Sequence, residues 1–194
     1  MPTRAIHLIS TRRLISSFWE DKIEMNLENV NFPRQLEAAG LAEKIRLALA
    51  ARKTRLWPEG KMEVPLLSIN ESLAGAIRNA RLQRRIRFGF DDIFDKLAAE
   101  KKGIDEMLQR QKSQQNYRVS RLLLFSNDGA ERLYRHIEQA LAEHHLRILG
   151  CQLDIDSKDL GRLITGKSAG IKVVLVEHKD AVSDVLKALV ENRE

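Results

Sequence analysis

The sequence predicts an α/β protein, a three-layer α-β-α sandwich with a mixed, largely parallel sheet, preceded by a helical amino-terminal extension. The main observation is that short apolar runs alternate with helical patterns from Val119 onward, which is typical of a sheet covered by crossover helices. The chain of 194 residues is 43% hydrophobic with only 10 Gly and 4 Pro, which favours a helix-rich folded protein over disorder. No stretch approaches eighteen consecutive apolar residues, so no membrane-spanning helix is predicted.

The carboxyl-terminal half supplies the best-defined elements. Residues 122–125 (LLLF) form an apolar run that ends in Ser-Asn-Asp-Gly, the pattern of a buried strand followed by a turn. Leu133, Ile137 and Leu141 recur one helical turn apart and predict a helix ending near His144. The pattern continues with a strand over 146–153, a helix over 157–164, a strand over 171–176 and a last helix around 182–189. This order is β-α-β-α-β-α.

The preceding elements are less regular. A helix is predicted over 71–83, an edge strand over 84–88, and a helix that begins at Asp91 or Asp92 and runs to Glu100. Residues 103–117 form a polar, Gln-rich stretch that is expected to be an insertion or a loose helix. A further helix is expected from Pro33 to Arg55, followed by a connector over 54–65 with two Pro and one Gly. We therefore divide the chain into an extension over 1–60 and a sandwich domain over 66–194.

The net charge of +6 is unevenly placed along the chain. Residues 118–194 carry 12 basic and 12 acidic side chains, so the whole excess lies before residue 118. Between Ser72 and Phe90 there is no acid, and there are five arginines: Arg78, Arg81, Arg84, Arg85 and Arg87. Such a local field attracts phosphate. The alternative is a solvated helix face that happens to lack acids.

The first nineteen residues contain three arginines and no acid. This pattern is found in mitochondrial transit peptides, and the alternative is an amphipathic helix whose Leu14, Ile15, Phe18 and Ile23 pack on the rest of the protein. A single cysteine, Cys151, excludes an internal disulfide framework and fits a reducing compartment. We expect a cytoplasmic protein, with the mitochondrion as the alternative.

One stretch matches the nucleotide-binding pattern GxxxxGK[ST] letter for letter, from Gly161 to Ser168. That loop requires a strand before the first glycine and a helix that begins at the Lys-Ser pair. Here a helical stretch precedes the glycine and a strand follows. The context therefore contradicts a nucleotide site.

Catalytic and metal sites are only weakly indicated. Asp128, Asp154 and Asp156 follow two strands and could meet at one sheet edge to hold magnesium, but turn and helix-start chemistry explains each of them equally well. His136, His144 and His145 lack metal-ligand spacing, and no nucleophile with a partnering base is apparent. We predict no enzyme activity, no catalytic residue, no bound metal and no cofactor.

Three blocks carry a resemblance to a known family. They are residues 121–130 (RLLLFSNDGA), residues 157–166 (SKDLGRLITG) and the strand over 171–176. With them, residues 72–190 resemble the kink-turn-binding ribosomal protein superfamily, whose α-β-α sandwich also occurs in release-factor carboxyl domains. The resemblance implies an RNA-binding protein with this fold.

In that family a Gly-x-Asn-Glu-x-x-Lys loop after the first strand grips RNA. The matching stretch here keeps the glycine as Gly89, replaces Asn-Glu by Asp91 and Asp92, and places the lysine one residue later as Lys96. Acids at those positions repel phosphate unless they contact base edges. The resemblance further implies phosphate contacts from the arginines before the loop and from the loop after residue 166. The expected RNA-binding residues are Arg81, Arg84, Arg85, Arg87, Gly89, Asp91, Asp92, Lys96, Lys167 and Ser168.

Three hypotheses follow for function. The first is a non-enzymatic protein that binds structured RNA and is associated with the ribosome or another ribonucleoprotein. The second is a protein-interaction module whose amino-terminal helices bind a partner. The third is a magnesium-dependent phosphoryl-transfer enzyme that uses the three aspartates.

Overall fold

The computed structural model describes residues 27–110 and 117–191. Its helices are a short 3-10 helix (Leu27–Asn29), α1 (Arg34–Ala38), α2 (Ala42–Ala50), α3 (Glu71–Leu82), α4 (Phe90–Arg110), α5 (Glu131–Glu143), α6 (Ser157–Thr165) and α7 (Lys179–Ala188). Its strands are β1 (Lys53–Arg55), β2 (Glu63–Leu67), β3 (Ile86–Phe88), β4 (Arg121–Phe125), β5 (Ile148–Leu153) and β6 (Val173–Val176). The predicted α/β class is confirmed.

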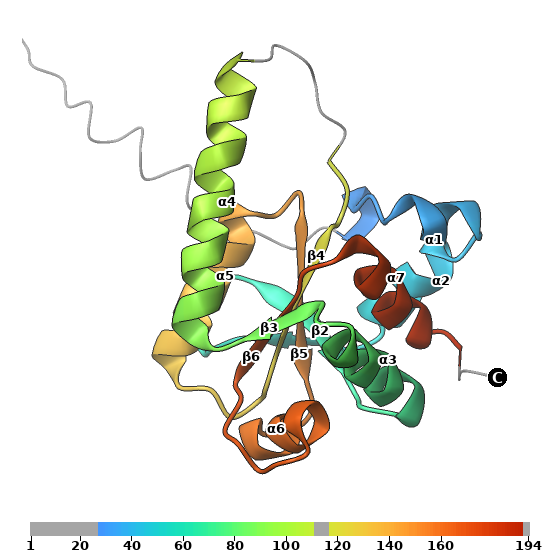
Figure 1. The fold of residues 1–194 in the computed structure, drawn as a ribbon, viewed down its shortest axis with the longest axis vertical. Helices are drawn as coiled ribbons and strands as arrows, with labels where there is room; N and C mark the ends of the chain where they lie inside the picture. The colour runs from blue at the N-terminus through green and yellow to red at the C-terminus, as the bar shows by residue number, and fades with distance from the viewer. Residues whose placement is uncertain (1–26, 111–116, 192–194) are drawn as a thin grey trace, which may run out of the picture.

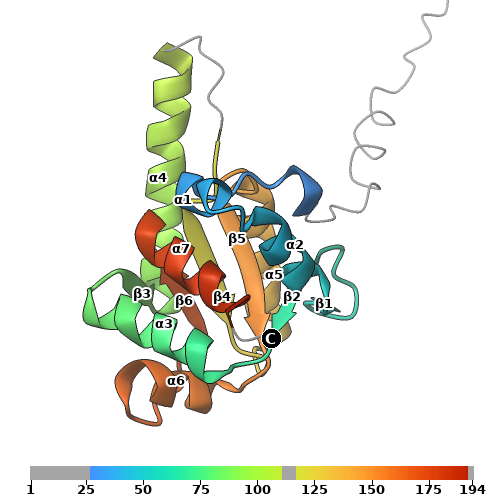
Figure 2. The ribbon, with the colours of Figure 1, turned by 90° about the vertical axis from the view of Figure 1, so that its right-hand side faces the viewer.

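The strands form one six-stranded mixed sheet in the order β1-β2-β5-β4-β6-β3. Helices cover both of its faces, as Figures 1 and 2 show. Alternation within β4 explains why: Leu122 and Leu124 face the core under α3 and α7, whereas Leu123 and Phe125 face the core under α4 and α5. A strand buried on both faces needs the continuous apolar run that the sequence shows.

The sheet is less parallel than expected. The pairs β2–β5 and β4–β5 are parallel, but β1–β2, β4–β6 and β3–β6 are antiparallel. The reason lies in the connection between β5 and β6, which does not cross to the opposite end of the sheet. Strand β6 therefore starts at the same end at which β5 finishes. Ser126 N at the end of β4 donates to Lys172 O just before β6, at 3.0 Å. Because β6 therefore starts where β4 ends, α6 lies at that end, the lower one in Figure 1, beside α3.

The helix predicted from Pro33 to Arg55 is wrong in its extent. It is divided into α1 and α2 near Gly40, whose φ of +67° is unfavourable for other residues. The last residues of the predicted helix form β1 instead, which pairs with β2 in register Thr54 to Val64. The predicted connector is therefore a hairpin, and its turn is closed by the Gly60 N to Trp57 O hydrogen bond of 2.9 Å.

The amino-terminal helices share a core with the sandwich. Phe32, Leu36, Ile45 and Leu49 are buried in the same cluster as residues of β4, β5 and α7. Arg46 fixes the preceding 3-10 helix by donating to Leu27 O and Val30 O, at 3.1 and 2.8 Å. Helices α1 and α2 thus pack into the same core as α3 and α7, on one face of the sheet. The predicted packing of residues 14–23 lies outside the described residues.

Helix α4 is longer than predicted. It starts at Phe90 and continues for 21 residues to Arg110, so the first half of the polar stretch over 103–117 is helical. Figure 1 shows that its far end projects beyond the sheet. Among the helices of the described ranges, none is long and apolar enough to cross a membrane.

Candidate functional site

A cavity of about 650 Å³ opens where β3 ends and α4 begins. Three segments far apart in sequence line it: the β3–α4 turn, the start of α5, and the chain that leads into β6. The lining residues are Phe88, Gly89, Phe90, Asp91, Ala130, Arg132, Leu133, His136, Gly170, Ile171, Lys172 and Val173. We call this cavity the β3–α4 pocket.

Gly89 makes the tight turn at the edge of this pocket. It joins β3 directly to α4 and has a φ of +110°, a conformation that side-chain-bearing residues rarely adopt. The carbonyl oxygen of Gly89 accepts the hydrogen bond of Ile93 N at 3.3 Å, so the glycine also begins the helix. The predicted glycine thus has a clear structural role at the pocket.

Aromatic rings form one wall. The Phe90 ring lies 4.5 Å from the Phe94 ring and 5.3 Å from the His136 ring, the latter in an edge-to-face arrangement. Phe90 retains 36% of its surface exposed, although Ile93 and Leu97 of the same helix are buried. An exposed ring held by two neighbouring rings offers a flat apolar surface to a planar ligand.

Two cations flank the same pocket. Arg132 at the start of α5 and Lys172 just before β6 are both exposed. Within the described ranges no ion pair engages either of them. Asp91 also lines the pocket, so the charge of the rim is mixed.

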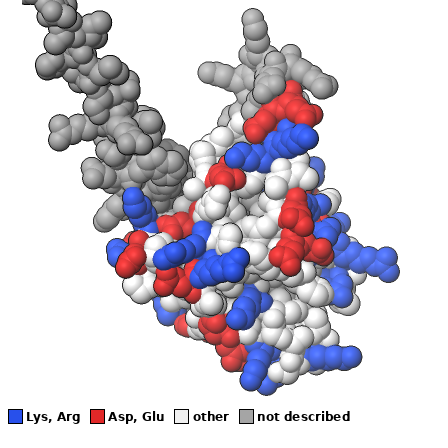
Figure 3. Space-filling view, turned by 90° about the vertical axis from the view of Figure 1, so that its left-hand side faces the viewer, with Lys and Arg blue, Asp and Glu red and all other residues white. Residues whose placement is uncertain are grey.

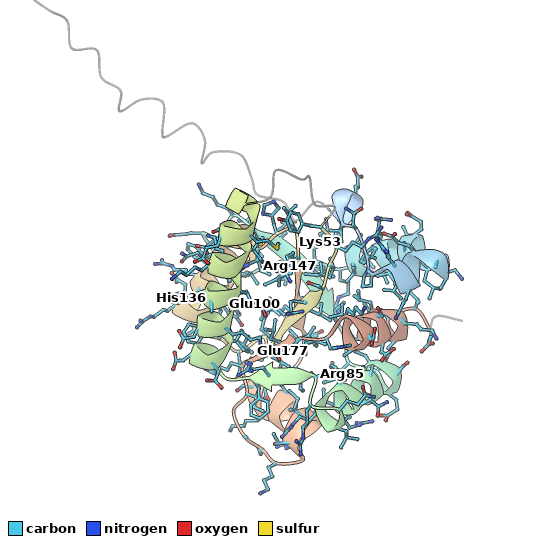
Figure 4. All side chains as sticks on the ribbon, turned by 45° about the horizontal axis from the view of Figure 1, so that its top comes forward. Lys53, Arg85, Glu100, His136, Arg147 and Glu177 are labelled. Atoms are coloured by element: carbon cyan, nitrogen blue, oxygen red, sulfur yellow. The ribbon has the colours of Figure 1, made fainter. Side chains whose placement is uncertain are left out.

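Two of the predicted RNA-binding cations are instead paired with Glu177. Arg87 Nε donates to Glu177 Oε1 at 2.6 Å, and Lys96 Nζ lies 3.7 Å from the same oxygen. The hydrogen bond to Glu177 raises the pKa of Arg87 above its ordinary value. Predicted Asp92 also faces Arg87, at 3.7 Å. Figure 4 shows Glu177 between Glu100 and Arg85 along the edge of the sheet.

The remaining predicted arginines lie at the other end of β3. Arg81 is partly buried with its guanidinium 5.4 Å from the centre of the Phe88 ring. Arg84 is exposed and Arg85 is partly exposed. Figure 3 shows the face that carries α4, where cationic and anionic side chains are interspersed and no continuous basic surface forms.

Lys167 and Ser168 occupy an exposed loop between α6 and β6. The loop cannot act as a nucleotide-binding loop, because Gly161 lies inside α6 and a strand follows the Lys-Ser pair. A Cβ atom on Gly161 would lie 1.7 Å from Ala169 O, so the glycine allows the loop to pack directly on the helix. Neither Lys167 nor Ser168 lines the β3–α4 pocket, but Gly170 of the same loop does.

The three aspartates weighed as a magnesium site all have protein partners. Asp128 accepts hydrogen bonds from the Ser126 hydroxyl and from the Ser157 amide and hydroxyl, at 2.7, 3.0 and 2.7 Å. Burial favours a higher pKa for Asp128, but these hydrogen bonds outweigh it and lower the pKa. Asp154 pairs with Arg52, and Asp156 caps α6. Across residues 27–110 and 117–191, no group of three His, Cys, Asp or Glu side chains could hold a metal ion.

Asp128 and Tyr134 fix the shape of the wall next to Ala130. The Tyr134 hydroxyl accepts from Gly129 N at 2.8 Å and from Gln152 Nε2 at 3.3 Å, and donates to Ser126 O at 3.1 Å. The turn after β4 is therefore tied to α5, to β5 and to the start of α6.

Sequence reasoning missed Phe88, Phe90, Arg132, His136 and Lys172. Phe90 could have been noticed, because it adjoins the Gly89 turn. Nothing in the sequence links it to His136, which is 46 positions away, or to Lys172, and only the fold brings these residues together.

Comparison with known proteins gives the following result. No protein-family model and no curated protein matches the chain. The structure is similar to that of a Bacillus halodurans protein with unknown function (TM-score 0.45, 11% identity, 63% of this chain and 100% of that chain). It is also similar to the Giardia lamblia 15.5kD RNA binding protein (TM-score 0.41, 14% identity, 63% of this chain and 88% of that chain). At these values neither likeness assigns a family or a function to the chain.

Proposed function

We propose that this chain is a non-enzymatic RNA-binding protein, and that the β3–α4 pocket receives an unstacked base of a structured RNA. The observation that carries the proposal is the exposed Phe90 ring, held against His136 in a pocket that the cations Arg132 and Lys172 also line. Folded and single-stranded RNA regions present flat bases beside phosphates, and proteins bind them with aromatic side chains and cations.

The mixed charge of the rim supports the same class of ligand. A base carries uncharged donors and acceptors, so Asp91 can accept from an amino group while Arg132 and Lys172 meet the adjoining phosphates. A purely anionic ligand would find Asp91 repulsive. The cavity volume of about 650 Å³ is within the range of small-ligand sites. A cavity of this size has room for one nucleotide.

The family resemblance supports the proposal independently. The Gly89 turn and the close contact of Gly161 with the following loop fall on two of the segments that resemble the kink-turn-binding superfamily. We infer that the chain is a divergent member of that superfamily, associated with a ribonucleoprotein. The residues proposed to meet the RNA outside the pocket are Arg81, Arg84, Arg85, Asp92, Lys167 and Ser168, while Arg87 and Lys96 contribute only when they leave Glu177.

Binding to three fluorescent ligands of equal length tests this function: a kink-turn RNA, an unstructured RNA and a duplex DNA. Anisotropy is measured at two salt concentrations for the wild type, for Phe90→Ala and for Lys172→Gln. Lys44→Gln, which replaces an exposed lysine of α2, is the control. We expect the wild type to prefer the folded RNA and to bind it less tightly as the salt concentration rises. Phe90→Ala should lower this affinity about tenfold, which corresponds to about 1.4 kcal/mol of stacking. The control keeps wild-type affinity.

Equal, weak binding to all three ligands, unchanged by Phe90→Ala, would contradict the proposal. The protein-interaction hypothesis would then lead, because α2 carries Leu47 with 63% of its surface exposed. Circular dichroism of each variant confirms that a loss of affinity is not a loss of folding.

A further inference from the structure

We infer that the corner between α3 and β3 is a second RNA contact, one that docks on the wide minor groove of an A-form RNA helix. The corner consists of Arg81, Leu82, Gln83, Arg84 and Arg85. The inference rests on the proposed function, because the same RNA must reach the β3–α4 pocket. Two independent features of the corner carry the inference: an arginine with a left-handed backbone and a leucine that is left exposed.

The first feature is the backbone of Arg84. Its φ is +57°, and it is the one residue other than glycine with a positive φ in the described part of the chain. The hydrogen bonds Arg84 N to Arg81 O and Arg85 N to Ala80 O, at 3.0 and 2.9 Å, close the end of α3 around it. Helices that end in this way strongly favour glycine at this position, because a side chain there is strained.

The arginine side chain gains nothing from the fold in return. Arg84 is exposed, and its guanidinium makes no hydrogen bond or ion pair within residues 27–110 and 117–191. Strain that the folded structure does not need is a sign of function. A guanidinium that projects from such a corner is well placed for a phosphate, which it can bind through two hydrogen bonds.

The second feature is Leu82. It exposes 80% of its surface, the most of any large hydrophobic residue in the described ranges. It lies at the last position of α3, two residues before the strained arginine. A single exposed leucine alone indicates little, but here it stands among three arginines. This combination fits a surface that meets ribose and base edges in its centre and phosphates around it.

The corner and the pocket form one surface. The Arg81 guanidinium lies 5.4 Å from the centre of the Phe88 ring, and Phe88 lines the pocket. The two sites are separated by the three residues of β3, which span about 10 Å. One RNA molecule can therefore contact both. Arg78 is excluded from the corner because it pairs with Glu71.

The chemistry of the corner favours a helical stem over a single strand. A-form RNA presents a wide, shallow minor groove of ribose hydroxyls and base edges between two rows of phosphates. Leu82 provides the central apolar contact, and Arg84 and Arg85 reach the phosphates. A single strand would require stacking rings, and the corner itself has none.

Replacing Arg84 by glycine separates function from stability. Arg84→Gly removes the cation and relieves the strain, so we expect its midpoint of thermal unfolding to rise by about 2–4 °C. Its affinity for an RNA that joins a duplex stem to a looped-out nucleotide should fall about three- to tenfold, with a shallower salt dependence. Leu82→Ser should lower the affinity for the same RNA without changing the salt dependence of binding. Arg34→Gln, which removes an exposed cation from α1, is the charge-matched control.

A second RNA distinguishes failure of this inference from failure of the proposed function. The same variants are measured on an RNA that keeps the loop but lacks the stem, where the corner variants should equal the wild type while Phe90→Ala still loses affinity. If Arg84→Gly raises the unfolding midpoint and leaves affinity for the stem-containing RNA unchanged, the corner is not a contact. If the wild type binds neither RNA, the proposed function fails first.

Discussion

Glu177 Oε1 accepts the hydrogen bond of Arg87 Nε at 2.6 Å, across 90 positions of sequence. The same carboxylate faces Lys96, and Lys96 faces Glu100, which in turn receives Arg121 Nη2 at 3.0 Å. This chain of alternating charges runs along the edge of the sheet under α4. It pairs two of the cations that the sequence predicts as RNA contacts, Arg87 and Lys96, with one carboxylate.

Removal of this carboxylate should therefore strengthen RNA binding. Glu177→Gln frees Arg87 and Lys96 for phosphate, so we expect RNA affinity to rise several-fold and the salt dependence to steepen by about one counterion for each freed cation. Anisotropy titrations across a salt series measure both. Glu43→Gln, which breaks the surface pair with Arg46, is the matched control and should bind as the wild type does. Unchanged affinity in Glu177→Gln would mean that Arg87 and Lys96 do not face the RNA.

The Asp128 carboxylate should make stability depend on pH. Its pKa in the folded protein lies below the ordinary value of 3.8, so its contribution is complete above the unfolded pKa and disappears as pH falls through the folded one. We expect Asp128→Asn to lose about 1 kcal/mol in the free energy of unfolding at pH 7, because Ser157 donates to both carboxylate oxygens and Asn retains only one acceptor oxygen. Urea unfolding at pH 7, 5 and 3 should show the difference shrinking only below about pH 4. A deficit that stays constant down to pH 3 would contradict this assignment.

Two glycine substitutions should have opposite effects. Gly161→Ala places a Cβ atom 1.7 Å from a backbone oxygen, so we expect a loss at or above the ~3 kcal/mol end of the range for overpacked sites. Gly103→Ala lies in exposed helix α4, where nothing is within 4 Å of the new atom, and should stabilise by about 0.5–1 kcal/mol. Chemical denaturation compares the two. A Gly161→Ala protein as stable as the wild type would show that the loop after α6 can move away from the helix.

Glu138 should hold the β1–β2 hairpin against α5. Its carboxylate accepts from Trp57 Nε1, Lys61 N and Met62 N, each at 2.7 Å. Glu138→Ala leaves these donors without their acceptor, and we expect a loss of about 2 kcal/mol in the free energy of unfolding. Glu138→Gln retains one acceptor oxygen and should lose less. Equal stabilities for both variants would indicate that water replaces the carboxylate fully.

Local sequence patterns were sufficient to predict the elements that are determined by residues close together in the chain. The apolar run of β4, the one-turn spacing in α5 and the helical pattern of α6 each express a local rule, and each element was predicted close to its observed bounds. The predicted cap of α6 was Ser157, whereas the structure has Asp156 as the N-cap and Ser157 as the first helical residue. The direction of β6 was not available in this way, because it depends on where the chain before it is anchored, at Ser126. The division of the amino-terminal helix depended on one left-handed residue, Gly40.

The candidate site was harder to predict than the fold. Gly89 was singled out by the family resemblance, and the arginines before it were singled out because they cluster in sequence. That Arg87 pairs with Glu177, and that Phe90 meets His136, depends on contacts across the whole domain. Charge counts along a chain therefore identify which cations are present but not which of them remain unpaired in the fold.

The two outer strands of the sheet have a consequence for the behaviour of the protein in concentrated solution. β1 and β3 are each three residues long, and each carries a cationic side chain, Lys53 and Arg55 on β1 and Arg87 on β3. A short charged edge offers a neighbouring molecule too few free backbone groups for strand addition. The sheet therefore resists growing from one molecule into the next, so the strand edges do not favour aggregation at high protein concentration.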